Sequence, residues 1–198
     1  MSAAALLDFI LTLDGLKAVE RQTMPAGLSR RENSAEHSWH GAMCALLLEG
    51  ECAFPVDARH AALLFLMHDV PEIGCGDTFV YADARSDAAQ REVAALEQLL
   101  VTLPAQNAAN LRELWEEFTA NQTPEAKYAN ALDRLMPLLH NLSHDGLSWR
   151  EHKVPREKVL ARVSFIGEVL PRIWQIVLPR IEDHFAGARY DTGTSLAG

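Results

Sequence analysis

Apolar residues recur at helical spacing along most of the chain, and strict strand-like alternation rarely extends beyond four residues. The stretch after Asp57 is the clearest case, because apolar and histidine side chains fall on one face at i, i+3, i+4 and i+7: Ala61, Leu64, Phe65 and His68. The pattern predicts an all-α fold.

Capping residues and prolines predict where the helices begin and end. Ser2 is a good N-cap for the first helix, and Ser86 for a later one. The expected helices cover about 2–21, 35–50, 58–70, 87–103, 107–120, 124–143 with a kink at Pro137, and a region from 155 to 185 that Pro171 and Pro179 divide. A glycine-punctuated loop is expected at 74–83 and a polar stretch at 144–154.

Length and composition indicate one globular domain. The chain has 198 residues, of which 48% are hydrophobic and 23% charged, with no internal repeat or linker. We expect a single domain over residues 1–186 and a flexible C-terminal tail over 187–198. The net charge of −9 argues against a DNA or RNA polymer as partner, because such binding uses a basic surface. A small anionic ligand in a local pocket stays possible.

The three cysteines and the first residues bear on location. Cys44, Cys52 and Cys75 are an odd number without a CxxC pair, which suggests reduced thiols in a cytoplasm. The N-terminal stretch lacks a basic start, and the longest apolar run, 61–67, is far short of the roughly 20 residues that cross a bilayer. We therefore expect a cytoplasmic protein without a membrane partner, and the hydrophobic C-terminal helices make a homodimer possible.

His68 and Asp69 place two metal-binding groups side by side just before Pro71 ends a strongly apolar helix. The alternative interpretation is a buried histidine satisfied by a neighbour. Asp133 projects from an apolar stripe, since its helical neighbours at −7, −4 and +3 are Ala126, Ala129 and Met136. A buried carboxylate needs a cation or hydrogen bonds, and a salt bridge to an arginine or lysine from another helix is the alternative.

His37 lies near the start of a helix whose following residues pack inward, although it can also be an ordinary helix-start histidine near Trp39. With His68, Asp69 and Asp133 it forms a mixed nitrogen and oxygen set. Such a set suits one divalent transition metal, of which Mn, Co, Fe, Ni and Zn are candidates. A helical bundle can bring these side chains together in its core.

Three segments carry a resemblance to a known family: RRENSAEHSW, LMHDVPEIGCGDTFVY and EAKYANALDRL. The chain resembles the HD-domain metal-dependent phosphohydrolases, in the branch of bacterial 5′-deoxynucleotidases and their eukaryotic HD-domain relatives. The similarity covers roughly residues 6–149. It implies a helical bundle of the HD-domain type and one divalent metal held by His37, His68, Asp69 and Asp133.

The same resemblance implies that Glu72 and Asp77 act at the catalytic step. The chemistry is reasonable, because one carboxylate can position and deprotonate the attacking water while another assists the leaving oxygen. The alternative is that both carboxylates cap a turn or a helix start.

Phosphate recognition is expected to use an arginine. The nucleotidase branch has an arginine followed by a tryptophan after the first helix, and here Arg21 matches but Gln22 replaces the tryptophan. Sugar selection therefore cannot be transferred to this chain. Arg30 and Arg31 are alternative phosphate ligands, or solvated loop charges.

The expected function is hydrolysis of a small phosphomonoester, a nucleoside or deoxynucleoside 5′-monophosphate. Cleavage of a nucleotide phosphodiester or triphosphate, and an inactive HD domain that binds a nucleotide or a protein partner, are the alternatives. The pairs His140/His144 and Trp149/His152 have no carboxylates nearby in sequence, so we interpret them as surface or interface residues.

Overall fold

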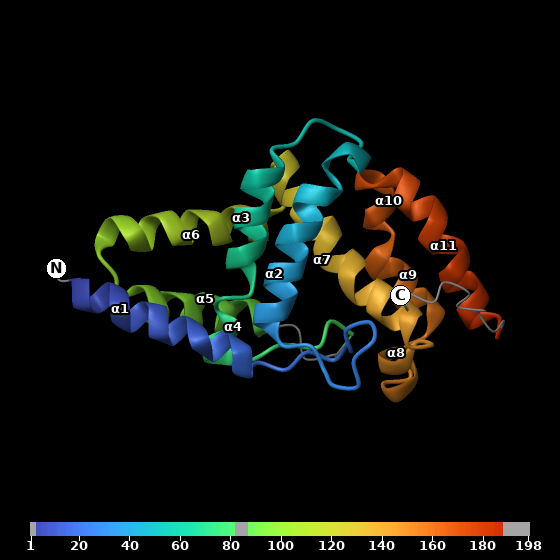
Figure 1. The fold of residues 1–198 in the computed structure, drawn as a ribbon, viewed down its shortest axis with the longest axis horizontal. Helices are drawn as coiled ribbons and strands as arrows, with labels where there is room; N and C mark the ends of the chain where they lie inside the picture. The colour runs from blue at the N-terminus through green and yellow to red at the C-terminus, as the bar shows by residue number, and fades with distance from the viewer. Residues whose placement is uncertain (1–2, 82–86, 188–198) are drawn as a thin grey trace.

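The computed structural model describes residues 3–81 and 87–187, and within them the chain is helical without a β-strand (Figure 1). This confirms the predicted all-α fold. The α-helices are α1 (Ala3–Thr12), α2 (Ser34–Leu47), α3 (Ala58–His68), α4 (Glu72–Cys75), α5 (Ala88–Leu100), α6 (Ala105–Ala120), α7 (Pro124–Ser143), α8 (Leu147–Glu151), α9 (Arg156–Val163), α10 (Phe165–Val169) and α11 (Pro171–Phe185). Two 3₁₀ helices, η1 (Leu13–Ala18) and η2 (Glu49–Glu51), follow α1 and α2.

Local capping explains why several helices begin where the sequence predicts. The Asp57 carboxylate accepts hydrogen bonds from the backbone N–H groups of Arg59 and His60, 2.9 and 3.2 Å away, at the start of α3. Thr123 caps α7 in the same way, and Pro124 occupies the first helical position. These bonds satisfy N–H groups that have no partner inside the helix.

Some element boundaries differ from the prediction. The helix expected over 2–21 ends at Thr12 and continues as η1, and residues 19–33 then run outside α-helix. Short helix α4 forms just before the expected loop and overlaps its first two residues, and α8 forms inside the expected polar stretch. Pro171 begins α11 as expected, whereas Pro179 lies inside it and does not divide it. Val177 and Ile181 are buried against the core, and the free energy gained by their burial outweighs the loss of the one helical hydrogen bond that Pro179 cannot donate.

Three predicted features lie at the edges of the described residues. Ser2 and Ser86 are outside them, so those two caps stay predictions, and the first helical residue of α5 follows Asp87. The predicted tail over 187–198 is outside them apart from Gly187.

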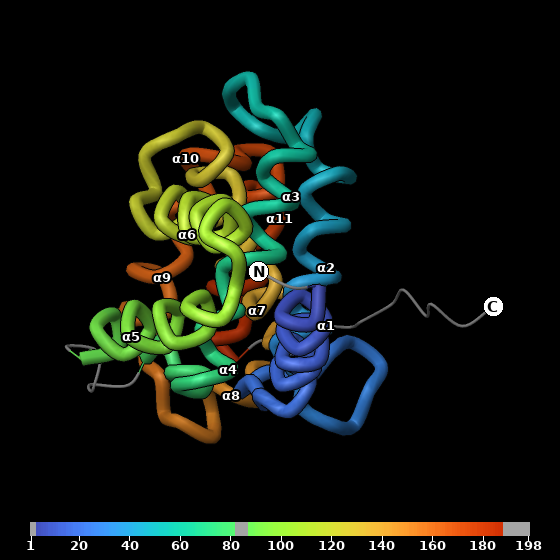
Figure 2. Tube along the Cα trace, turned by 90° about the vertical axis from the view of Figure 1, so that its left-hand side faces the viewer, coloured from blue at the N-terminus to red at the C-terminus, as the bar shows by residue number. Residues whose placement is uncertain are grey.

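Helices α2, α3 and α7 lie at the centre, between a group formed by α1, α5 and α6 and the C-terminal helices α8–α11 (Figure 1). Figure 2 views the molecule from the first of these two ends and shows α1, α5 and α6 as separate rods there. The main core joins α2, α3 and α7 to the C-terminal helices, and a second apolar cluster joins α1, α3, α5 and α6.

A glycine permits the close approach of α2 to α3. A Cβ atom at Gly41 would lie 2.0 Å from Cε1 of Phe65, so the Phe65 ring packs against bare backbone. Phe65 is fully buried, as is Tyr128 of α7, whose hydroxyl donates to the Ala45 carbonyl at 2.9 Å. The Gly41–Phe65 contact holds α2 and α3 together one turn from His37 and His68, and the Tyr128–Ala45 bond holds α7 to the other end of α2. Among the described helices, none has the length and apolar character needed to cross a membrane.

Candidate metal centre

The backbone before α2 brings two charged side chains to the centre. An isolated antiparallel bridge joins Glu20 to Asn33, the Arg21 amide donates to the Glu32 carbonyl at 2.9 Å, and the Glu32 amide donates to Thr23 at the same distance. Arg21 and Glu32 are therefore neighbours although eleven positions separate them in the numbering. Asn33 then caps α2 in a reciprocal capping box.

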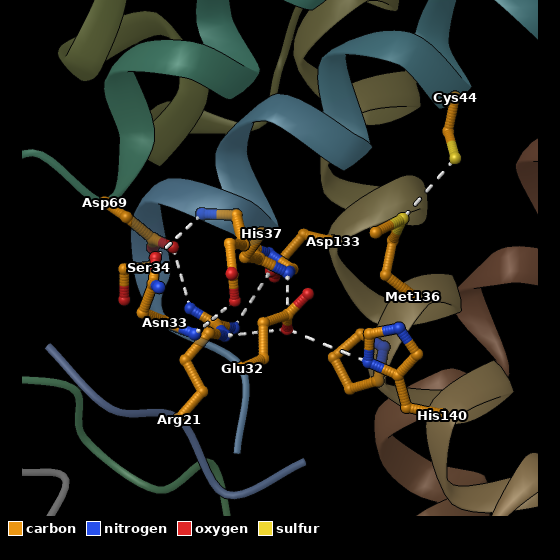
Figure 3. Close-up of polar contacts among 12 residues, drawn as sticks. Arg21, Glu32, Asn33, Ser34, His37, Cys44, Asp69, Asp133, Met136 and His140 are labelled. Carbon is orange, nitrogen blue, oxygen red and sulfur yellow. Dashed lines mark hydrogen bonds and ion pairs between the residues drawn. The ribbon is translucent and has the colours of Figure 1, made fainter. Parts of the chain in front are cut away.

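The four predicted metal ligands converge from three helices. His37 lies in the first turns of α2, His68 and Asp69 end α3, and Asp133 lies midway along α7. Nε2 of His37 is 3.3 Å from Oδ1 of Asp133. Nε2 of His68 is 2.8 Å from Oδ1 of Asp69 and 3.6 Å from Oδ1 of Asp133. Figure 3 shows the side chains of His37, Asp69 and Asp133 pointing toward one another.

Neighbouring groups orient both imidazoles. Nδ1 of His68 donates to the Phe65 carbonyl at 2.6 Å, which leaves Nε2 facing the carboxylates. Nδ1 of His37 faces Oε2 of Glu32 at 3.4 Å, so its Nε2 also faces inward. Metal-binding histidines in proteins are oriented in this way, with the second ring nitrogen on a carbonyl or carboxylate.

The group fits a divalent cation. Ligand atoms of His37, His68 and Asp69 all lie within 4.8 Å of one another, and Nε2 of His68 is buried without a hydrogen-bond partner among the described residues. Asp133 adds a second carboxylate at the distances above. A buried nitrogen and oxygen set with an unsatisfied imidazole is the chemistry that a borderline divalent ion satisfies.

Close packing of opposite charges shifts the pKa values of these groups. Burial alone would lower the pKa of His68, but the charges of Asp69 and Asp133 raise it to about 10. Burial would raise the pKa of Asp69, yet His68 and Arg21 lower it to about 2. Against its own burial, Asp133 has a pKa well below the ordinary value because of the hydrogen bond with His37 and the nearby His68 imidazole.

Arg21 lies inside the centre rather than at its rim. Its side chain is buried, Nη1 donates to Oδ2 of Asp69 at 2.7 Å, and Glu72 and Asp133 have oxygens 4.0 Å from the guanidinium. The nearby carboxylates raise the pKa of Arg21 despite its burial, so the charge is permanent. Asp133 also pairs with Arg162 of α9 at 3.2 Å. The salt bridge considered for Asp133 thus exists together with the histidine contacts.

Glu72 and Asp77 are close to the ligands on the Arg21 side. Oε2 of Glu72 accepts a hydrogen bond from the Ser34 hydroxyl at 2.6 Å. Burial and the charge of Asp69 raise the pKa of Glu72 to about 9, while Arg21 opposes the shift. Burial also raises the pKa of Asp77, with Arg21 opposing and Asp69 reinforcing the shift. Glu72 is the first residue of α4, so it combines a helix-start position with contact to the centre.

The other candidate arginines have partners at the surface. Arg30 makes two hydrogen bonds to the Glu36 carboxylate, at 2.8 and 2.5 Å. Arg31 donates to Oε1 of Gln22 at 2.5 Å and pairs with Glu151 at 3.3 Å. Gln22 takes the position at which the nucleotidase branch has tryptophan, and its side-chain oxygen accepts the hydrogen bond from Arg31. Of the three arginines, Arg21 is the one that contacts the predicted ligands.

A cavity of about 60 Å³ opens beside the centre. It is lined by charged residues of the centre and by aromatic side chains: Arg21, Asp77, Asp133, Arg162, Phe79, Tyr81 and Trp149. The enclosed space holds only a few water molecules and is much smaller than a typical ligand pocket. The space beside the centre therefore matches a phosphate-sized group, and larger parts of a ligand would lie outside it, at the partly exposed Phe79 and Tyr81.

Sequence reasoning missed three residues of this region and misplaced two. Glu32, His140 and Arg162 contact the centre or its ligands. Glu32 and Arg162 stand in no recognisable spacing relative to His37 or Asp133, whereas His140 lies seven residues after Asp133, two turns further along the same face of α7, and that spacing was an available signal. The expectation that His140 and Trp149 are surface or interface residues is wrong, since only 4% and 3% of their surfaces are exposed in the isolated chain. Each faces the core through tertiary packing, which sequence distance from carboxylates does not reveal.

The fold and the site together are those of an α-helical domain with a cluster of histidine and aspartate side chains at its centre. A family model described as an HD domain matches residues 13–174, so the chain belongs to the HD-domain family. This confirms the family resemblance inferred from the sequence motifs.

Particular relatives are similar over most of their length. The human protein named 5′-deoxynucleotidase HDDC2 is 29% identical over 157 residues, covering 78% of this chain and 74% of the relative. Its Xenopus laevis counterpart is 30% identical over 149 residues, covering 74% of this chain and 72% of the relative. A crystal structure titled as a predicted metal-dependent phosphohydrolase from Magnetospirillum magnetotacticum MS-1 is 39% identical, with a TM-score of 0.86 and 92% of both chains covered.

Proposed function

We propose that this protein is a metal-dependent phosphohydrolase that acts on nucleoside or deoxynucleoside 5′-monophosphates and releases nucleoside and phosphate. The observation that carries the proposal is the convergence of four buried metal-ligand candidates beside a buried arginine and two further carboxylates. The names of the curated relatives support the substrate class.

In this proposal His37, His68, Asp69 and Asp133 hold one divalent transition metal. When bound, the cation supplies Lewis-acid polarisation of a phosphoryl oxygen and makes a nearby water more acidic. Mn, Co, Fe, Ni and Zn all suit the mixed imidazole and carboxylate set. The contacts of Phe65 and Glu32 with the histidines keep one ring nitrogen of each free for this role.

Arg21 is the proposed phosphate ligand. Its guanidinium is the arginine group nearest the centre among the three candidates, and it lines the small cavity. A planar, permanently charged group can bind two phosphate oxygens at once. Arg30 and Arg31 are engaged by Glu36, Gln22 and Glu151.

Glu72 and Asp77 are the proposed proton-transfer groups. Glu72 takes a proton from the attacking water as the water oxygen bonds to phosphorus, and the hydrogen bond from the Ser34 hydroxyl, 2.6 Å long, orients its carboxylate for this role. The ester P–O bond then breaks, and Asp77 donates a proton to the departing 5′ oxygen. Its raised pKa is in the direction that such an acid requires. The products are a nucleoside and inorganic phosphate.

The aromatic side of the cavity is the proposed contact surface for the nucleoside. Phe79 and Tyr81, both partly exposed, line this side and pack edge to face, with ring centroids 5.4 Å apart. Aromatic faces can stack with any base, so they support nucleotide binding without selecting a base. The absence of tryptophan at Gln22 leaves sugar preference to experiment.

A substrate panel tests the proposed activity directly. Ribonucleoside and deoxynucleoside monophosphates are incubated with Mn²⁺ or Co²⁺, with and without a chelator, beside a phosphodiester and nucleoside triphosphates. We expect phosphate release from monophosphates that stops with chelator. Release from the diester or triphosphate alone would favour the alternative hydrolase activities. No turnover combined with nucleotide binding would favour an inactive HD domain.

A variant pair separates catalysis from folding. Glu72→Gln is expected to keep metal content and melting temperature but to lose about 10²–10⁴-fold in kcat, the usual contribution of a positioned general base. The control is Glu97→Gln, because Glu97 pairs with Arg112 at 2.8 Å on the surface, away from the centre. Near-wild-type turnover in Glu72→Gln would contradict the assigned role.

A cytoplasmic location and a homodimer complete the proposal. Three free cysteines support a reducing compartment. An apolar groove of about 400 Å³, bordered by exposed Trp39, Leu63 and Leu66, supports contact with a second copy, and it lies over α1–α3 rather than on the C-terminal helices. Light scattering on wild type and Trp39→Glu tests it: a wild-type monomer would contradict the dimer.

A further inference from the structure

A second cluster of metal-binding groups lies on the other side of Glu32 from the candidate centre. Glu32 precedes α2, His40 is one turn beyond His37 on α2, and His140 is in the last turns of α7. One ligand atom from each of Glu32, His40 and His140 lies within 4.8 Å of the others. The HD-domain ligands His37, His68 and Asp69 form a separate group.

The two inner members of this cluster are buried and poorly satisfied. Glu32 exposes 1% of its surface and His140 4%. Oε2 of Glu32 and Nδ1 of His140 face each other at 3.7 Å, and neither atom has a hydrogen-bond partner among the described residues (Figure 3). Oε2 of Glu32 has charged or polar neighbours, Nε of Arg21 at 3.7 Å and Nδ1 of His37 at 3.4 Å, but no hydrogen bond within the described part of the chain. Buried polar atoms without hydrogen bonds are costly, so the juxtaposition of Glu32 and His140 points to a missing partner.

The third member gives the cluster an opening to solvent. His40 is exposed, and its ring stacks on that of His140 with centroids 6.1 Å apart and an interplanar angle of 26°. An ion could therefore enter from the His40 side and reach the two buried groups. The side of the site toward solvent would leave room for water as a fourth ligand.

We propose that Glu32, His40 and His140 form a second divalent-cation site, suited to a borderline ion such as Zn²⁺ or Co²⁺. Two histidines and one glutamate are a common ligand set for zinc, with bonds of about 2.0–2.2 Å. Ligand atoms at tetrahedral angles on such an ion lie about 3.4 Å apart. In the cluster, Oε2 of Glu32 and Nδ1 of His140 are 3.7 Å apart, and all three ligand atoms lie within 4.8 Å of one another. Small side-chain movements would therefore bring these atoms to the distances that an ion requires.

The second site is connected to the HD centre through one carboxylate. Oε2 of Glu32 is 3.4 Å from Nδ1 of His37 and 3.7 Å from Nδ1 of His140. A cation held by Glu32 would draw this carboxylate away from His37, so occupancy of the second site is expected to alter ion affinity at the first. The proposal itself does not depend on the proposed hydrolase activity, because ion stoichiometry measures it directly.

The test counts Co²⁺ ions bound per chain by equilibrium dialysis and follows the Co²⁺ absorption spectrum. We expect two ions in wild type, one in His68→Ala, which lacks a ligand of the HD centre, and none in the double variant His68→Ala/His40→Ala. The control is His68→Ala/His60→Ala, because His60 is another partly exposed histidine with a carboxylate 2.7 Å away, on Glu117. That control should keep one ion.

Two outcomes would overturn the proposal. One is that the wild-type chain binds a single Co²⁺ ion. The other is that it binds a second Co²⁺ ion but that His40→Ala changes the affinity for this ion less than tenfold. If His68→Ala does not fold, wild type is compared with His40→Ala and His140→Gln, which should each bind one ion instead of two. Circular dichroism confirms that each variant is folded.

Discussion

Replacing Gly41 by alanine tests how helix packing positions the metal centre. A Cβ atom at this position would lie 2.0, 2.1 and 2.6 Å from three carbons of the Phe65 ring. Ordinary contacts are 3.4 Å or longer, so the ring or the whole of α2 has to move by more than 1 Å. Phe65 is fully buried, and the centroid of its ring lies 5.2 Å from the ring centroid of His37 and 4.7 Å from that of His68. The movement therefore reaches two proposed ligands.

The expected cost can be worked out from these contacts. Overpacking a core costs about 1–3 kcal/mol, and the severity of this clash places it near the upper end. Alanine gains about 1 kcal/mol over glycine inside a helix. The free energy of unfolding should thus fall by about 2 kcal/mol, equivalent to a decrease in Tm of about 4–8 °C for a chain of this size. Metal affinity should fall at least tenfold.

The assay is urea and thermal unfolding together with Co²⁺ titration. Gly50→Ala is the matched control, because no atom lies within 4 Å of a Cβ built there, and it should leave stability and metal affinity unchanged. Adding Phe65→Leu to Gly41→Ala should cost less than the sum of the single changes, since the smaller side chain removes the clash. A Tm within about 1 °C of wild type, with unchanged metal affinity in Gly41→Ala, would refute the packing argument.

Other changes test individual groups of the centre. Arg21→Ala should keep the metal but lower kcat/KM at least tenfold through a higher KM, equivalent to about 1.4 kcal/mol of transition-state stabilisation. Arg30→Ala should change neither the metal content nor kcat/KM. Steady-state kinetics and elemental analysis measure these two quantities. His68→Ala and Asp69→Ala should lose the metal and lower Tm, and metal content equal to wild type would contradict the ligand assignment. Because the folded-state pKa of Asp69, about 2, lies below its ordinary value of 3.8, the carboxylate stabilises the fold above about pH 4. That contribution disappears as pH falls through about 2, so the difference in unfolding free energy between wild type and Asp69→Asn should shrink with acidification.

Local patterns in the sequence determined much of the fold. Periodicity and the positions of the prolines predict the α-helical class and the starts of α3 and α7, where Asp57 and Thr123 cap these helices in the structure. These features depend on residues within one or two turns, where intrinsic preferences and capping bonds dominate. The short helices α4 and α8 were missed because four or five residues carry too little periodicity to be recognised.

The candidate ligands were also visible in the sequence, as polar groups on apolar faces together with recognisable motifs. Their convergence required the packing of α2, α3 and α7: His37 and Asp133 are 96 positions apart, yet their side chains lie 3.3 Å from each other. Sequence spacing constrains a side chain relative to its own helix and says nothing about crossing angles between helices.

Only the tertiary structure decided which charges accompany the ligands. Arg21 and Glu32 are neighbours through the Glu20–Asn33 bridge, and His140 reaches Glu32 from the far end of α7. Neither relation follows a helical period, because both depend on where a loop and a distant helix meet. Burial of Glu32 and His140 in turn leaves unsatisfied polar atoms that no composition or motif reveals. The sequence thus determined the long helices and the types of the candidate ligands, whereas packing of the whole chain determined the partners of these side chains, because burial and long-range contacts exist only in the folded state.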